Sequence, residues 1–502
     1  METTRTLSAA QVLNRTQPTD APSRRTVDAT RGQDAVSEFR LLIGGKLVEG
    51  AGTLDVINPA TGRVLTTAPR ADRGQLERAV AAAKAAFPSW AATPLRLRGG
   101  LLAKLADALE TEQSEFARLL TQEQGKPLPQ AQWEIAQSIG TLRYFSALDL
   151  PPVVLKEDTT QKVVRQHKPL GVVAAITPWN FPVILLIFQV APALLAGNTI
   201  VAKPAPTTPL TTLRFGELCA RVLPAGVVNV IVDQNDLGTA LTSHPDVAKV
   251  TFTGSTATGK KVMANAAGTL KRLTLELGGN DAAIALGDID PKEVTPKIYA
   301  AAMANAGQFC IGIKRLYVHD SIHDAVCEEL GRLARETVVG DGLEQGTEMG
   351  PLQNKAQFEK VKGYLEDAQQ NGKIVAGGGV LEREGYFVQP TIVRDIPDPA
   401  RLVREEKFGP VLPVKRYSDI DEVIERANDT DFGLGASVWS SDRDRAFAVA
   451  ARIDAGTVWV NKHADLSPDT PYSGAKQSGL GVGLGLEGLE EFTQATIVNV
   501  AK

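Results

Sequence analysis

The chain has 502 residues, which is too many for a single hydrophobic core, so we expect two or three lobes. Hydrophobic residues make up 43% of the chain and charged residues 22%, which is ordinary for a soluble globular enzyme. The formal net charge of -4 leaves no basic surplus to attract a polyanion. We therefore expect no nucleic-acid partner.

The cysteine and hydropathy patterns argue against a disulfide-rich protein, a metal-binding protein and a membrane protein. The three cysteines, Cys219, Cys310 and Cys327, form no CxxC pair and are too few for a disulfide framework, which favours a reducing compartment and a cytoplasmic location. With only five scattered histidines, no metal site is expected. The most apolar stretch, 183–196, is shorter than the roughly 20 residues of a membrane span, so we expect no membrane association.

The N-terminal part differs from the rest of the chain in composition. Residues 1–37 are poor in apolar residues and rich in Thr, Arg, Ser and Asp, which predicts a disordered N-terminal extension. An organelle transit peptide is the alternative, but its amphipathic pattern is weak. Next, FRLLIGGKLVEG predicts a strand, a Gly-Gly turn and a second strand, and helical spacing predicts helices over 76–90 and 96–123.

The middle of the chain alternates short apolar strands with helices. The expected strands lie in GVVAAI, NTIVAKP, GVVNVIV, VAKVTFTG and LTLELGG. Helices are expected from 183, over 208–223, near 237 and over 257–267. Such apolar strands predict a parallel sheet covered on both faces. Ligands bind outside the carboxyl ends of these strands, where PWNFP, KPAPTTP, DQNDLG, TGSTATG and LELGG gather.

A second α/β block is expected from residue 281 to about 468. Its candidate strands are AAIAL, RLYVHD, LPVKRY, ASVWS and GTVWVNK. Its expected helices span 291–306, 322–338, 355–371, 420–428 and 442–452. Residues 153–168 have the polar alternating pattern of an exposed hairpin, which would be free to reach a partner subunit.

Six motifs in one order connect the chain to a family. They are PWNFP (178–182), TGSTATG (253–259), LELGGND (275–281), NAGQFC (305–310), EEKFGP (405–410) and PYSGAKQSGLG (471–481). Together they resemble the aldehyde dehydrogenase superfamily from about residue 40 to the C-terminus. The resemblance implies an α/β aldehyde dehydrogenase fold and a homodimer or homotetramer. Its parts would be a Rossmann-like NAD-binding domain (38–152 and 170–280), an α/β catalytic domain (281–468) and a small β oligomerisation segment (153–169 and 482–502).

Cys310 lies on a turn just beyond the expected helix 291–306. A thiolate is the best side-chain nucleophile for a carbonyl carbon, but it needs a lowered pKa and partial access. Most cysteines are instead buried and inert, as we expect for Cys219 and Cys327 inside amphipathic helices. The resemblance makes Cys310 the nucleophile that carries a thioester.

Two further residues complete the expected chemistry. Attack by Cys310 generates an oxyanion, to which Asn180 and the Cys310 backbone N–H can donate, although Asn180 could otherwise be a plain turn residue. Glu276 is an acid inside an apolar strand, so burial suits it as a general base, and a structural carboxylate fits the sequence equally well. In the family this position is the base, and members that pass the thioester to coenzyme A generally lack it, so the resemblance implies release of free acid.

The cofactor site is expected at the strand ends. TGSTATG joins a strand to a helix, so Ser255 and the first helical N–H groups can hold a phosphate, although the turn does not match GxGxxG. The resemblance implies that Lys203 bonds the adenosine ribose, and that Glu406 and Phe408 hold the nicotinamide ribose and ring. The other expected cofactor contacts are Ile176, Thr177, Pro178, Trp179, Gly254, Gly259 and Leu277.

Two departures from the family bear on the choice of cofactor. Pro206 stands where NAD-preferring members often carry a Glu that bonds the ribose 2′-hydroxyl, and Asp233 stands where a Gly is expected. A carboxylate at Asp233 would repel a 2′-phosphate and could accept from a 2′-hydroxyl. We therefore expect NAD as the cofactor, with NADP possible.

The residues expected around the substrate aldehyde are mostly apolar. Motif alignment places six residues around the aldehyde, each of which could also be ordinary core: Leu185, Phe188, Phe309, Ile311, Leu466 and Tyr472. None is Arg or Lys, which disfavours dicarboxylic semialdehydes and favours apolar or aromatic aldehydes, oxidised to the acid. The alternatives are a semialdehyde-specific or acylating dehydrogenase and a catalytically silent protein on the same fold.

Overall fold

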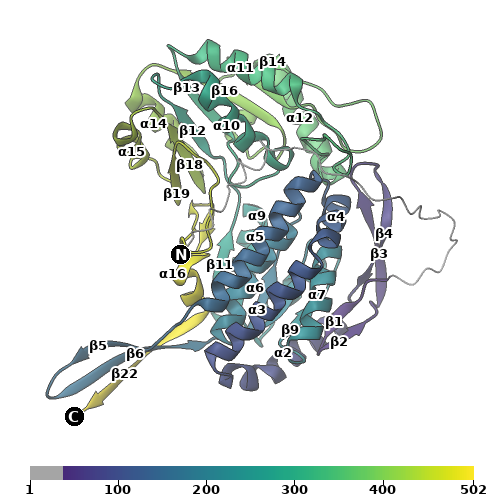
Figure 1. The fold of residues 1–502 in the computed structure, drawn as a ribbon, viewed down its shortest axis with the longest axis vertical. Coiled ribbons are helices and arrows are strands. Elements are labelled where there is room, and N and C mark those ends of the chain that lie inside the picture. Colours follow the sequence, from purple (N-terminus) through teal and green to yellow (C-terminus); the bar gives the residue numbers. More distant parts are fainter. Residues whose placement is uncertain (1–37) are drawn as a thin grey trace.

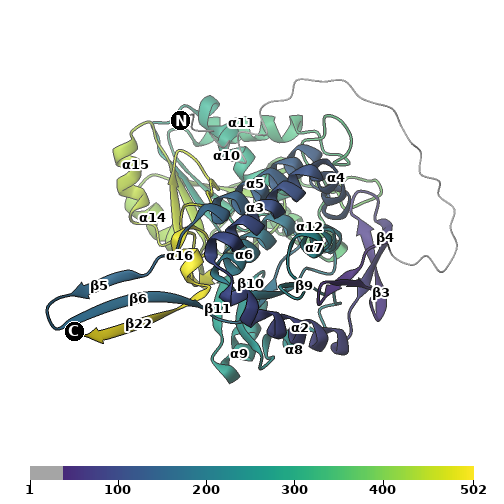
Figure 2. The ribbon, with the colours of Figure 1, turned by 60° about the horizontal axis from the view of Figure 1, so that its bottom comes forward.

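The computed structural model describes residues 38–502, which form two α/β lobes, each around its own sheet (Figures 1 and 2). The predicted N-terminal extension, 1–37, lies outside the described residues. In the described part of the chain, no helix combines the length and the apolar character that crossing a membrane requires.

The first sheet follows the predicted alternation of strands and helices. Its eight strands, in chain order, are β1 (Leu41–Ile43), β2 (Lys46–Val48), β7 (Val172–Ile176), β8 (Thr199–Lys203), β9 (Val228–Val230), β10 (Val247–Thr253), β11 (Arg272–Glu276) and β21 (Gly479–Leu480). In space the order is β2-β1-β9-β8-β7-β10-β11-β21. The central strands β9, β8, β7, β10 and β11 pair in parallel as predicted, while β1, β2 and β21 add antiparallel edges.

Helices cover both faces of this sheet. They are α2 (Arg73–Ala92), α3 (Leu95–Thr111), α4 (Gln113–Gln124), α5 (Leu128–Ala147), α6 (Pro182–Ala196), α7 (Leu210–Val222), α8 (Gly238–Thr242) and α9 (Thr256–Ala266). In Figure 2, α3, α5 and α6 lie on one face of the sheet and α2, α8 and α9 on the other. The hairpin of β3 (Gly52–Asn58) and β4 (Arg63–Arg70) stands at the side.

For this lobe one sequence prediction was wrong and one helix was missed. The single helix predicted over 96–123 is broken at Glu112, which ends α3 and precedes α4 with non-helical φ and ψ of -103° and 11°. Helix α5 was not predicted at all. Its buried face repeats at helical spacing through Ala131, Ile135, Ile139 and Leu142 and packs against α3, α4 and α6.

The second lobe contains the other sheet. Its strands are β12 (Ala282–Ala285), β13 (Arg315–His319), β14 (Lys373–Ala376), β15 (Thr391–Arg394), β16 (Val411–Tyr417), β18 (Gly435–Trp439) and β19 (Thr457–Val460). Its helices are α10 (Pro291–Met303), α11 (His323–Glu336), α12 (Lys355–Asn371), α13 (Arg401–Arg404), α14 (Ile420–Asn428) and α15 (Arg443–Ala450). All five predicted strands are present and pair in parallel, while β14 and β15 were missed. The spatial order is β14-β15-β16-β13-β12-β18-β19.

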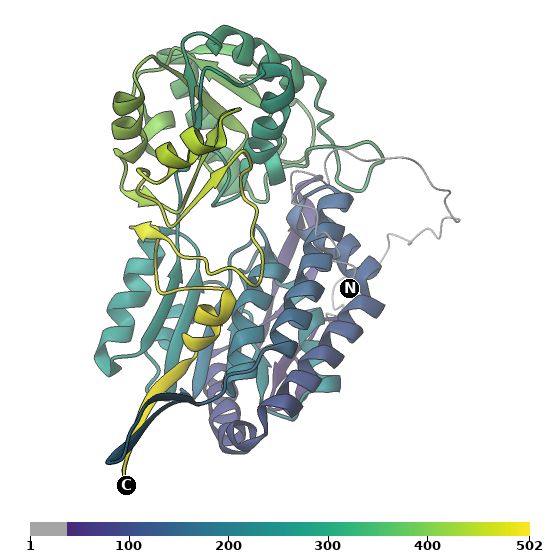
Figure 3. The ribbon, with the colours of Figure 1, turned by 60° about the vertical axis from the view of Figure 1, so that its left-hand side comes forward.

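A long arm projects from the first lobe (Figures 1 and 3). It is a three-stranded antiparallel sheet of β5 (Val153–Glu157), β6 (Gln161–Pro169) and β22 (Thr493–Ala501), in the order β22-β6-β5. The predicted hairpin is therefore present, and the C-terminal strand pairs along its full length with β6. Before β22 the chain forms β17 (Phe432–Gly433), β20 (Ala475–Lys476) and α16 (Gly485–Glu490).

Candidate active site

The carboxyl ends of the first sheet bring most predicted cofactor residues together. Ile176, Lys203 and Thr253 are the last residues of β7, β8 and β10. Thr177 follows β7 and is buried, and its hydroxyl has no hydrogen-bond partner among the described residues. Trp179 contacts Phe408 of the second lobe edge to face, with ring centroids 5.4 Å apart. Both lobes therefore contribute to this edge.

The glycine turn leaves the start of α9 open. A Cβ on Gly254 would lie 2.6 Å from the Phe252 ring, and one on Gly259 would lie 2.4 Å from Leu277. Only glycine fits at either position without movement. Exposed Ser255 caps α9, its hydroxyl accepting from the Thr258 N–H at 3.3 Å. The positive end of α9 is thus available to a phosphate.

Lys203 and Asp233 bind each other. The Lys203 ammonium lies 2.6 Å from Asp233 Oδ1, and Asp233 Oδ2 accepts from the Leu237 N–H at 2.8 Å. Both side chains are buried. A ribose hydroxyl at Asp233 would therefore share an oxygen that is already bonded, which the sequence alone did not indicate.

Glu406 reaches across from the second lobe to the end of β11. Its Oε1 accepts from the Gly279 N–H at 3.0 Å, and a Cβ on Gly278 would lie 2.6 Å from its Oε2. Burial raises the pKa of this carboxyl. With the unpartnered Thr177 hydroxyl and the open end of α9, these residues fit a nicotinamide dinucleotide laid across the strand ends.

The turn that carries Cys310 is backbone-strained. Helix α10 ends at Met303, three residues before the predicted end, because Asn305 and Ala306 adopt left-handed φ values of 51° and 54°. Gly307 follows with φ 70°, and a Cβ there would lie 2.2 Å from the Gly409 carbonyl oxygen. Such strain persists only where the surroundings fix the chain, as at functional turns.

Cys310 is partly exposed to a cavity, but its thiol is not activated as the sequence suggested. Burial raises its pKa to about 12, and the carboxylates of Glu406, Asp281 and Glu276 act in the same direction, against the lowering effect of Lys314. The expectation of a lowered pKa is therefore wrong for the protein by itself. The thiol stays protonated at neutral pH, so its attack on a carbonyl requires a base.

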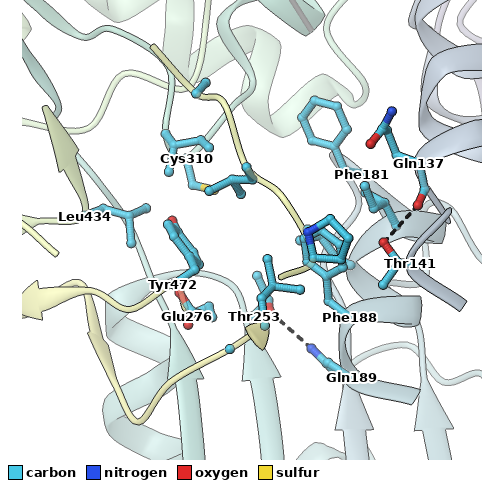
Figure 4. A pocket seen from close by; sticks show the side chains of 18 of the residues that line it. Gln137, Thr141, Phe181, Phe188, Gln189, Thr253, Glu276, Cys310, Leu434 and Tyr472 are labelled. Atoms are coloured by element: carbon cyan, nitrogen blue, oxygen red, sulfur yellow. Dashed lines mark hydrogen bonds between the residues drawn. The ribbon is translucent and has the colours of Figure 1, made fainter. Parts of the chain in front are cut away.

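Glu276 ends β11 and lines the same cavity as Cys310 (Figure 4). Both of its carboxylate oxygens are buried, with no hydrogen-bond partner among the described residues. Burial raises its pKa well above the usual 4.5. An unpartnered buried carboxyl is costly for stability and suits proton exchange.

Asn180 is held by a buried network that was not predicted. Its side-chain amide donates to the Gln308 carbonyl oxygen at 3.1 Å, two residues before Cys310. Its backbone oxygen accepts from the Lys126 ammonium at 2.9 Å, and Lys126 pairs with Glu134 of α5. Glu134 also accepts from the first N–H groups of α6, at 2.9 and 3.2 Å. The network fixes the PWNFP turn relative to the Cys310 turn.

Comparison of the sequence with known proteins identifies the family. Residues 47–498 match the model of the aldehyde dehydrogenase family. The chain belongs to the aldehyde dehydrogenase family. Phenylacetaldehyde dehydrogenase from Pseudomonas fluorescens is 41% identical, over 92% of this chain and 96% of that protein.

Solved structures agree with the sequence comparison. The NAD+ complex of aldehyde dehydrogenase from Bacillus cereus is 37% identical with a TM-score of 0.90, over 92% of this chain and 96% of that one. An NADP-dependent enzyme from E. coli is 35% identical with a TM-score of 0.89, over 93% and 99%. The chain is thus an NAD(P)-dependent aldehyde dehydrogenase, and the predicted fold is confirmed.

The cavity of this aldehyde dehydrogenase has a volume of about 120 Å³ and mostly apolar walls. In Figure 4, Cys310, Glu276 and Tyr472 face Phe181 and Phe188 across it. It is lined by all six residues that the sequence placed around the aldehyde: Leu185, Phe188, Phe309, Ile311, Leu466 and Tyr472. Sequence reasoning missed Trp133, Gln137 and Thr141, because α5 itself was missed, and Phe181, which lies inside the quoted PWNFP motif.

Proposed function

We propose that this aldehyde dehydrogenase oxidises apolar or aromatic aldehydes to carboxylic acids with NAD, through a thioester on Cys310. The observation that carries the proposal is the cavity that contains both Cys310 and Glu276. Aromatic rings form much of its wall: the Phe181 ring is tilted against Phe309 with centroids 4.8 Å apart and meets Trp133 edge to face at 6.5 Å. None of the described residues that line it is Lys or Arg. A second carboxylate on the substrate would find no counter-charge there.

The protein's own groups supply the proton transfers. Glu276 takes the proton of the Cys310 thiol through water in the shared cavity, and the thiolate attacks the aldehyde carbon. The resulting oxyanion accepts from the second N–H of the Asn180 amide and from the Cys310 backbone N–H. Because the first N–H of that amide is bonded to Gln308, the donor is oriented before the substrate arrives.

Lys203, Glu406 and the N-terminal end of α9 would hold NAD at the strand ends, and the bound cofactor would supply the hydride acceptor. Glu276 then removes a proton from the water that attacks the thioester. The product leaves as the carboxylate, and the proton of the nascent acid restores the Cys310 thiol. Since Glu276 is present in the cavity, hydrolysis is favoured over transfer of the acyl group to another thiol.

Substrate preference is tested with a panel of aldehydes. We expect kcat/KM for phenylacetaldehyde and hexanal to exceed that for succinate semialdehyde by more than about tenfold, ~1.4 kcal/mol of differential binding. The relative from Pseudomonas fluorescens carries phenylacetaldehyde in its name.

The variant F188A should lose kcat/KM for phenylacetaldehyde while keeping that for acetaldehyde, whereas F447A, at a 70% exposed position, should change neither. Preference for succinate semialdehyde would contradict the proposal.

The choice between NAD and NADP is tested at Asp233. The variant D233N removes the carboxylate and so breaks the ion pair with Lys203. The Lys203 ammonium would then be an uncompensated positive charge near the ribose, where it can attract a 2′-phosphate. We expect the ratio of kcat/KM with NADP to that with NAD to rise by about tenfold, ~1.4 kcal/mol. D236N, which removes a neighbouring exposed acid paired with Arg70, is the control. An unchanged ratio in D233N would show that Asp233 does not set the preference.

We also propose that the arm joins subunits into a homodimer or homotetramer. Its strands expose apolar side chains that a single chain leaves in water: Val153, Val154, Leu155, Ile497, Val498 and Val500. Exposed apolar rows on an edge sheet are typical of subunit contacts. Light scattering of the purified enzyme measures the state directly. The cytoplasmic location stays a prediction.

A further inference from the structure

A row of polar side chains crosses the first sheet beneath Glu276. Strands β10 and β11 run in parallel register, with Thr251 beside Thr274 and Thr253 beside Glu276. Every second residue of a strand faces the same side, so these four side chains share one face. All four line the cavity that contains Cys310. Strands buried on both faces are normally continuous in apolar residues, so packing alone does not account for the row.

The row continues below the cavity to the protein surface. The Thr274 hydroxyl accepts from the Lys249 ammonium at 2.7 Å, and that ammonium lies 3.4 Å from Glu491 Oε2. Lys249 is fully buried, whereas the Glu491 side chain is 32% exposed. The other charged group acting on Lys249 is Arg272 of β11. Burial lowers the pKa of Lys249 to about 8, so a neutral fraction of its amine exists near neutral pH.

The opposite wall of the cavity contributes one more polar group. Gln189 of α6 donates to the Thr253 hydroxyl at 3.1 Å and to the Ile176 carbonyl oxygen at 3.3 Å. Its own oxygen is buried without a hydrogen-bond partner among the described residues. A buried cavity wall with unpartnered polar atoms and several hydroxyls holds ordered water. The part of the cavity wall formed by these polar side chains is therefore suited to water, unlike the part formed by aromatic rings.

The reaction requires a route of this kind. Its balance is RCHO + NAD+ + H2O → RCOO− + NADH + 2 H+. One proton comes from the Cys310 thiol and the other from the attacking water. The Glu276 carboxyl holds one proton at a time and has no hydrogen-bond partner within residues 38–502. It must therefore release each proton to solvent before it can accept the next one.

We propose that these protons leave Glu276 through the polar row and exit at Lys249 and Glu491. A proton moves from the Glu276 carboxyl to water held against the polar side chains of the cavity wall. The Thr274 hydroxyl accepts it and passes its own proton to the neutral Lys249 amine. Glu491 takes the proton from the ammonium and releases it to bulk water. Lys249 and Glu491 act through Glu276, and the inference rests on the proposed role of Glu276 as the base.

The test removes single members of the row from the full-length enzyme. T274V keeps the shape of the side chain without its hydroxyl, E491Q removes the exit carboxylate and K249M removes the amine. In dilute buffer we expect each to lower kcat at least tenfold, with KM for the aldehyde within twofold of the wild-type value. Concentrated imidazole, a small proton carrier, should restore much of the loss, and the solvent deuterium isotope effect on kcat should increase.

Matched controls separate proton transfer from structural damage. K271M removes another buried lysine of the same lobe, which bonds the carbonyl oxygens of His244 and Val247 away from the cavity. E490Q removes the acid next to Glu491. Neither should depend on imidazole. T274V and E491Q keep the test decisive if K249M does not fold.

Three results would overturn the inference or its basis. Wild-type kcat in T274V and E491Q would overturn the route, and so would losses that imidazole does not change. A wild-type kcat in E276Q would overturn the base role itself. Loss in E276Q with no loss in T274V and E491Q would leave the proposed function standing and remove only the exit path.

Discussion

Replacing Cys310 with alanine is expected to lower kcat for NADH formation by on the order of 10⁴- to 10⁶-fold. Cys310 is the one cysteine among the described cavity-lining residues, so no second thiol can form the thioester. The measurement is NADH absorbance with a saturating aldehyde. NAD binding, followed by fluorescence, should persist, because the proposed cofactor contacts lie at the strand ends and on Glu406.

The other two cysteines provide matched controls. Cys219 in α7 and Cys327 in α11 are buried, and burial raises the pKa of Cys327 to about 11. C219A and C327A should keep kcat near the wild-type value. Because the Cys310 pKa lies far above neutral, its alkylation by iodoacetamide should accelerate about tenfold per pH unit from pH 7 to 9. Retention of a tenth or more of kcat in C310A would refute the nucleophile assignment.

The succession of strands and helices along the chain could be predicted because each element has its own hydrophobic pattern, whereas their order within each sheet was not predicted. The helices predicted over 355–371 and 420–428 have those bounds in α12 and α14, where amphipathic spacing is uninterrupted. The break at Glu112 could not be read from periodicity, because the apolar spacing continues on both sides of it. Helix α5 was missed although its spacing is present, since Pro127 precedes it, Pro129 lies in its first turn and polar residues dilute the pattern.

The sequence could predict which residues form the site, but not the charges and hydrogen-bond partners that surround them. Cys310, Glu276 and Asn180 lie in motifs, and motifs state which residues occur. The raised pKa of Cys310 depends first on its burial and then on Glu406 and Asp281, which approach it only in the folded chain. The Lys203–Asp233 pair and the link from Lys126 to Asn180 likewise join residues that are distant in sequence. Such pairings follow from strand order, and no local pattern encodes them.

The variant E276Q should separate the two halves of the reaction. Removing a general base costs about 10²- to 10⁴-fold in the step that it serves. Because Glu276 also serves the Cys310 thiol, the burst is measured at pH 9, where more of the thiolate forms without the base. There the variant should form one equivalent of NADH and then turn over slowly, since thioester hydrolysis still lacks its base. Base action requires the ionised carboxylate, so kcat of the wild-type enzyme should rise with pH through the range where Glu276 ionises, and that rise should be absent in E276Q.

The variant E276Q should be more stable than the wild-type enzyme, although it is less active. The pKa of Glu276 lies well above 4.5 in the folded protein, so the folded state holds its proton more tightly than the unfolded chain does. The free energy of unfolding therefore falls as pH rises above about 4.5, where the unfolded chain ionises first. E276Q removes this loss, so its Tm should match the wild-type value at pH 4 and exceed it at pH 8.

An exposed carboxylate provides the control for this pair of effects. E384Q removes the carboxylate that pairs with Arg63 at the surface and should alter neither the burst nor the pH dependence of Tm. A wild-type steady-state rate in E276Q would assign the base elsewhere. A Tm difference that does not depend on pH would mean that the buried carboxyl is already ionised in the folded enzyme. A burst together with a pH-dependent gain in Tm would identify one carboxyl as both the base and a cost to stability.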